Sequence, residues 1–129
     1  ADQYRESALL NFLAMQDARQ EAENAYLYYK KVYNFNSNNA NLNYKIASVL
    51  LLTNRKEFAK KYLEKAIFFS VDLPDEFIFF HAMVLQLEGK YIEAIDKYEY
   101  FMQNGKKKLV AKYSTLLKKF IAVSYCFLL

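Results

Sequence analysis

The sequence predicts an all-α protein assembled from repeated pairs of helices, and three observations lead to this prediction. Hydrophobic residues make up 54% of the 129 residues, which is enough for a sizeable core. Only two glycines and one proline occur, whereas a β-rich or loop-rich fold of this length needs many more turn residues. Small residues also recur at a fixed distance along the chain. Long helices joined by short turns account for all three.

Two series of alanines repeat with the same period. Ala25, Ala59 and Ala94 are spaced by 34 and 35 residues, and Ala47 and Ala82 are spaced by 35 residues. We expect these alanines at helix–helix contacts, because a small side chain lets two backbones approach closely while larger side chains fill the space where the axes diverge. A period of this length corresponds to a helix, a tight turn and an antiparallel helix.

The period and the turn residues together place the helices along the chain. They are expected at about 3–16, 18–34, 40–53, 56–70, 75–88, 91–104 and 107–127. This gives three repeats, at approximately 3–36, 40–71 and 75–105, followed by a closing helix. The first repeat fits least well: Ala14 takes its close-contact position only if the turn there is one residue short.

Turn chemistry supports the boundaries. Asn38 or Asn39 can cap the first helix of the second repeat with its side chain. Pro74, with two acidic residues directly after it, marks the start of the third repeat, because proline and negative charge both favour a helix N-terminus. Gly89 and Gly105 are expected to end helices with positive φ angles.

The period, the paired helices and the linker Asn36-Ser37-Asn38-Asn39 resemble those of tetratricopeptide repeat (TPR) proteins over nearly the whole chain. One departure is the Leu-Gly pair of the first TPR helix, which reads Ile46-Ala47 and His81-Ala82 here. The resemblance implies a single domain over residues 1–129. It also implies a right-handed superhelix of about seven helices, namely three helix-turn-helix units and the closing helix, whose inner surface is lined by the first helix of each repeat.

A narrower resemblance rests on the segments 38–47, 59–67 and 89–101. They are similar to the N-terminal TPR region of envelope proteins of the Bacteroidetes, in which a β-propeller-like segment and an outer-membrane-protein-A-like, peptidoglycan-binding domain follow. This resemblance implies a module excised from a longer periplasmic protein with a role in secretion, motility or peptidoglycan association. A cytoplasmic protein is the alternative.

The TPR phase predicts which side chains line the concave groove and bind a protein or peptide segment. They are Tyr44, Lys45, Ser48 and Leu51 in the second repeat and Phe79, Phe80, Met83 and Gln86 in the third. An apolar, aromatic groove with a few polar points suits a segment with hydrophobic anchors. Substitution of Phe79 or Phe80 by a charged residue is then expected to abolish binding and leave the fold intact.

Two alternatives to an open groove remain. The closing helix can pack on Phe79, Phe80 and Met83, in which case the chain is a structural spacer that positions neighbouring domains. A closed pocket lined by Tyr44, Phe79 and Phe80 would instead favour a regulatory sensor of a small peptide or lipid. All of these interpretations describe a non-enzymatic protein.

The sequence contains no constellation for catalysis, a metal or another cofactor. His81 is the only histidine and is expected to be structural, because no ligand-type residues stand near it at metal-binding spacing. Cys126 lies in an apolar run and is expected to be a buried, inert thiol.

Charge gives no strong indication of a nucleic-acid or membrane partner. The net charge is +4, and the basic residues are partly clustered at Lys106, Lys107, Lys108 and Lys112. We interpret this cluster as a solvated helix start, because nucleic-acid binding needs a broader basic stripe and no apolar stretch is long enough to insert through a membrane.

Overall fold

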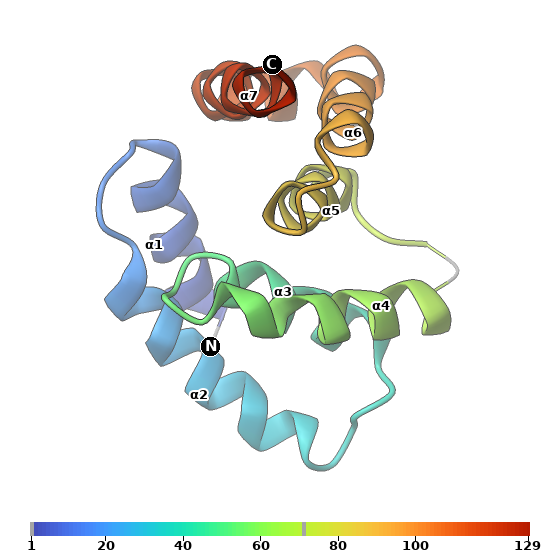
Figure 1. Ribbon diagram of the computed structural model, residues 1–129. Coiled ribbons are helices and arrows are strands. Elements are labelled where there is room, and N and C mark those ends of the chain that lie inside the picture. Colours follow the sequence, from blue (N-terminus) through green and yellow to red (C-terminus); the bar gives the residue numbers. More distant parts are fainter. Residues whose placement is uncertain (1, 71) are drawn as a thin grey trace. The chain divides into compact units, whose positions relative to one another are not determined.

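The computed structural model describes residues 2–70 and 72–129, and these residues have an all-α fold (Figure 1). The α-helices among them are α1 (Asp2–Leu13), α2 (Arg19–Tyr33), α3 (Ala40–Leu50), α4 (Ala59–Phe69), α5 (Glu76–Leu87), α6 (Tyr91–Asn104) and α7 (Lys107–Leu128). A short 3-10 helix, η1 (Lys56–Phe58), precedes α4. All seven predicted helices are confirmed. The end of the second predicted repeat, at residue 71, lies outside the described residues, as does residue 1.

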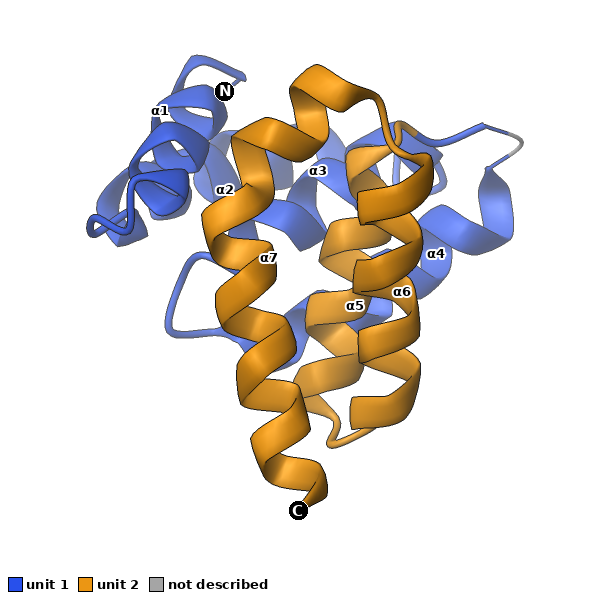
Figure 2. Cartoon of the chain, turned by 90° about the horizontal axis from the view of Figure 1, so that it is seen from above, with its two compact units in different colours: residues 1–73 blue, residues 74–129 orange. Residues whose placement is uncertain are grey.

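The chain divides into two compact units, residues 1–73 and residues 74–129 (Figure 2). Unit 1 contains α1 to α4, and each of these helices packs against the next one along the chain. Unit 2 contains α5, α6 and α7, with α6 packed against both of the others. The pairing of consecutive helices within each unit is the arrangement that the repeat period predicts.

The alanine series explains the close helix pairing. Ala25, Ala47, Ala59, Ala82 and Ala94 are all completely buried. A small buried side chain adds little bulk, so neighbouring helices can approach closely and the surrounding large side chains can interlock without voids. The prediction that these positions are buried is confirmed.

The first helix pair uses a different alanine from the one that the sequence indicates. Ala14 is exposed and follows the end of α1, so its predicted close-contact role is wrong. Ala8 of α1 and Ala22 of α2 are completely buried instead. The turn after α1 contains Met15 with a φ of 59°, so the chain leaves the helix earlier than the hydrophobic pattern suggests.

The predicted cap of α3 and one of the two glycine turns are confirmed. The Asn39 side chain accepts a hydrogen bond of 2.8 Å from the backbone N–H of Leu42. This satisfies one of the donors that a helix start leaves without an intrahelical partner. Gly89 has a φ of +79° and lies in the turn between α5 and α6.

Gly105 has a different reason to be glycine. Its φ of −70° and ψ of 159° are extended, so the predicted positive φ is wrong. A Cβ atom here would lie 2.7 Å from the carbonyl oxygen of Phe101 and 2.8 Å from Cγ2 of Val110. The absence of a side chain therefore allows α7 to follow α6 closely.

Candidate partner-binding surface

In unit 1, two of the predicted groove residues, Tyr44 and Ser48, accept hydrogen bonds from a buried arginine. Arg5 of α1 is only 6% exposed. Its Nε donates to Ser48 Oγ at 2.9 Å and its Nη2 donates to the Tyr44 hydroxyl at 3.2 Å. The guanidinium also lies 5.3 Å from the centroid of the Tyr44 ring, within cation–π range. The guanidinium of Arg5 on α1 therefore has its hydrogen-bond acceptors in the side chains of Tyr44 and Ser48 on α3.

The neighbouring lysine is paired as well. Lys45 Nζ donates to both carboxylate oxygens of Asp2, at 3.1 and 3.2 Å, and the hydroxyl of Tyr29 donates to the same carboxylate. The Tyr29 hydrogen bond, followed by that of Lys45, holds the pKa of the Asp2 carboxyl below its usual range. Leu51, the last predicted groove residue of this unit, is completely buried directly after α3.

In unit 2, Phe79 is the centre of an aromatic cluster. Its ring centroid is 4.6 Å from that of Tyr113 and 6.0 Å from that of Phe120, both on α7. The other members of the cluster are Phe80, Tyr98 and Phe101. Phe79 is completely buried, so α7 covers the face of α5 on which this side chain lies.

The remaining predicted residues of α5 are also engaged within unit 2. Phe80 is completely buried, with its ring edge-on to that of Tyr113, and Met83 is 8% exposed. Gln86 Oε1 accepts a hydrogen bond of 2.7 Å from the Tyr98 hydroxyl. Burial raises the pKa of Tyr98 well above its usual value, so this phenol is a hydrogen-bond donor throughout the neutral range.

The structure therefore places the eight predicted groove residues in two separate units, where most are buried and several are bonded to neighbours in their own unit. The expectation that a charged residue at position 79 or 80 leaves the fold intact is wrong. Phe79 and Phe80 are completely buried, and an unpaired charge at such a position is strongly destabilising. The assignment of these residues to partner binding stays a prediction.

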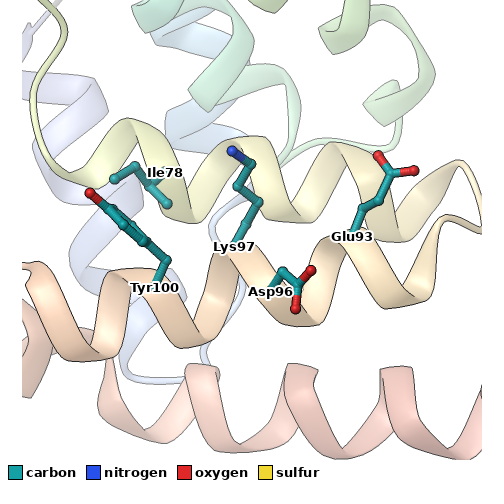
Figure 3. A pocket seen from close by; sticks show the side chains of 5 residues that line it. All are labelled: Ile78, Glu93, Asp96, Lys97 and Tyr100. Carbon is teal, nitrogen blue, oxygen red and sulfur yellow. The ribbon is translucent and has the colours of Figure 1, made fainter.

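An exposed hollow of about 330 Å³ lies on α5 and α6, and the sequence did not indicate it. It is lined by Ile78, Glu93, Asp96, Lys97 and Tyr100 (Figure 3). In Figure 3, Lys97 and Glu93 extend from α6 toward α5. In the sequence, Glu93 and Lys97 are four residues apart, which by itself indicates only a pair of opposite charges on one helix face. Tyr100, which is 55% exposed and seven residues after Glu93, extends the same helix face and is the signal that could have revealed the hollow.

A second feature without a sequence signal is an array of lysines and tyrosines between α2 and α4. Lys30 Nζ donates to the Tyr62 hydroxyl at 3.1 Å and lies 4.4 Å from the centroid of the Tyr33 ring. Lys65 Nζ donates to the Tyr33 hydroxyl at 2.9 Å. These contacts hold the two helices together through cation–π and hydrogen-bonding interactions. The chain contains 12 tyrosines, and two of them, Tyr33 and Tyr62, take part in these contacts.

His81 is partly buried, whereas Cys126 is exposed. His81 is half-buried beside Phe77, and burial together with the charge of Lys97 lowers its pKa. In the described part of the chain, no three His, Cys, Asp or Glu side chains come together as metal ligands would. Cys126 is exposed, so the predicted buried thiol is wrong; it lies on the solvent face of α7.

No family model matches the sequence, and neither a curated protein nor a solved structure is significantly similar to it. Among the residues that the structure describes, no helix has the length and hydropathy needed to cross a membrane.

Proposed function

We propose that the chain is a non-enzymatic scaffold of the TPR type that mediates protein–protein interaction as a module of a larger, periplasmic cell-envelope protein. The observation that carries the proposal is the alanine series, which repeats every 34 or 35 residues and is completely buried at all five positions. Stacked helix pairs of this kind present extended surfaces to protein or peptide segments. No cofactor takes part in this function.

The exposed hollow on α5 and α6 is the part of unit 2 that best suits a first contact with a partner. Phe79 and Phe80 are covered, whereas Tyr100 is 55% exposed beside charged groups of both signs. A tyrosine next to a small hollow can anchor a partner side chain, and tyrosines are among the residues that dominate binding energy at interfaces. We therefore propose Tyr100 as the anchor position of unit 2.

A structural spacer is the second candidate function, and one observation favours it. Tyr113 and Phe120 of α7 pack on Phe79, where a bound segment would otherwise lie. In this case the helices serve to position the domains on either side, and no partner enters the predicted groove.

Site-specific photo-cross-linking separates the two functions. A cross-linking amino acid is placed at Tyr100 and, as a matched exposed control, at Lys31 of α2, in the native full-length protein in its own cells. The scaffold proposal predicts an adduct that is specific to position 100. The purified partner should then bind the Tyr100→Ala variant about thirtyfold more weakly, as expected for an interface hot spot. Identical adducts at both positions, or none, would support the spacer.

A further inference from the structure

The charge of unit 2 is segregated along the chain. From Lys106 to Leu129 there are six lysines and no acidic residue, whereas residues 74–105 contain six acidic residues and two lysines. The basic segment forms α7, and the acidic segment contains the exposed hollow on α5 and α6. One unit therefore carries surfaces of opposite charge, and such surfaces on two copies of it attract each other.

A row of four exposed residues runs along α7. This basic row consists of Lys108, Lys112, Thr115 and Lys119. The residues follow one another at intervals of four, three and four, which places them on one face of the helix. The opposite face packs inside unit 2, where Tyr113 is 1% exposed and Leu117 is completely buried. The basic row is thus positive at three positions and has a neutral hydroxyl at the remaining one, Thr115.

An exposed row with the same intervals runs along α6. This α6 row consists of Glu93, Lys97, Tyr100 and Asn104, of which the first three line the hollow (Figure 3). Among the described residues, no ion pair involves a member of either row. Both rows are exposed in the same copy, so they are not paired with each other within it.

The charges of the two rows match when the helices are laid antiparallel. Glu93 of the α6 row then meets Lys119 of the basic row, and opposite charges attract. Lys97, the only positive residue of the α6 row, meets Thr115, the only uncharged residue of the basic row. In a parallel arrangement Lys97 would meet Lys112, and the like charges would repel. The order of charges therefore selects both the partner row and its direction.

The two remaining positions of the antiparallel arrangement are also complementary. Tyr100 meets Lys112, and its ring is 55% exposed, so the ammonium can lie over the ring face. Asn104 meets Lys108. The amide nitrogen of Asn104 donates to the backbone carbonyl of Tyr100 at 3.1 Å, which leaves the amide oxygen as an acceptor for this lysine. Each lysine of the basic row thus has an acceptor or a ring opposite it.

We infer that the α6 row and the hollow beside it bind the basic row of a second copy of this chain. The inference rests on the proposed use of the hollow for protein binding, and it names the partner. A nucleic-acid backbone or an anionic lipid surface would attract the lysines alone. The second copy also accounts for the neutral position at Thr115 and for the hollow. The contact joins different surfaces of the two copies, so it is heterologous.

Sedimentation velocity of the full chain tests this inference. We expect weak association that rises with concentration between roughly 0.1 and 1 mM, because the contact is small and polar. Added salt should weaken it by screening. A chain that stays monomeric over this range at low salt would overturn the inference.

Substitutions at Thr115 separate the second copy from a polyanion. Thr115→Lys makes α7 more basic, yet it should weaken self-association about fivefold, because the new charge meets Lys97. Thr115→Glu should strengthen self-association by a similar factor. A polyanionic partner requires the opposite order for the two variants. If Thr115→Lys associated as strongly as the parent or more strongly, the proposed register would be wrong.

A mixing experiment tests the two surfaces together. Lys112→Glu/Lys119→Glu removes the basic row and Glu93→Lys/Asp96→Lys removes the negative charge of the hollow, so each variant alone should associate at least about tenfold more weakly. An equimolar mixture should recover association, because each variant retains the surface that the other has lost. The first variant has no net charge, so general attraction between the chains does not explain recovery. No recovery in the mixture would overturn the inference.

The matched control is Lys31→Glu/Lys56→Glu, which makes the same change in net charge at exposed positions of unit 1 and should associate like the parent. Circular dichroism confirms that every variant is folded. Equal association by the two lysine variants would overturn the inference. If the chain stays monomeric while cross-linking still gives an adduct specific to position 100, the inference fails and the scaffold proposal stands.

Discussion

At the residue scale, the buried Arg5 decides the environment of the predicted groove residues in unit 1. A charged side chain that leaves water loses several kcal/mol of solvation unless hydrogen bonds replace it. Ser48 Oγ and the Tyr44 hydroxyl supply such bonds to the guanidinium. Their polar atoms are therefore part of the internal structure of unit 1, which joins α1 to α3. Residue type alone could not reveal this, because the arginine and its acceptors are about 40 positions apart in the sequence.

Ser48→Ala is expected to destabilise unit 1 by about 1.5–3 kcal/mol, because it removes an acceptor from a buried charged donor. The same substitution in an Arg5→Met background should cost much less, since no guanidinium is left without its partner. Urea unfolding of the four chains of this double-mutant cycle measures the coupling. A cost for Ser48→Ala that does not depend on the residue at position 5 would contradict the assigned role of this hydrogen bond.

At the element scale, the sequence was sufficient to place the helices but not to determine which of their faces are exposed. Few turn residues and a strict repeat of small residues determine where helices begin and pair, and both signals are local. Phe79 would show the same apolar pattern whether it lined an open groove or packed on another helix. Only the path of α7, which depends on the close turn at Gly105, decides between these two environments.

Substitution of the two glycines should separate steric from conformational effects in these turns. Gly105→Ala is expected to cost about 1–3 kcal/mol, because the new methyl group overlaps a carbonyl oxygen and displaces α7. Gly89→Ala should cost about 1–2 kcal/mol through its positive φ alone, since the space around it is open. Near-ultraviolet circular dichroism should change only for Gly105→Ala, because only that variant disturbs the packing of α7 on the aromatic cluster. An unchanged aromatic signal in this variant would contradict the steric role.

At the scale of the whole molecule, the repeat period predicted the order and pairing of the helices. The same period gave no indication that the chain divides into two compact units. The alanine spacing continues from Ala59 in unit 1 to Ala94 in unit 2 without any change. The units are distinguished by contacts between positions far apart in sequence, such as Arg5 with Ser48 and Phe79 with Phe120. Such contacts depend on three-dimensional packing, which a repeat of small residues does not specify.

Because residues 74–129 form a compact unit with a buried aromatic core of its own, this segment should fold by itself. We expect a fragment of these residues to be helical and to unfold cooperatively in urea, with tyrosine circular dichroism following the loss of helix. Phe79→Ala should lower the stability of the fragment by about 3–5 kcal/mol, as for other large aromatic truncations in a core.

A shorter fragment that ends at Gly105 should lose cooperative unfolding, since Tyr113 and Phe120 would be missing from the cluster. If the shorter fragment unfolded as cooperatively as the longer one, α7 would not be required for the folding of α5 and α6. Phe79 would then be available to a partner once α7 had left.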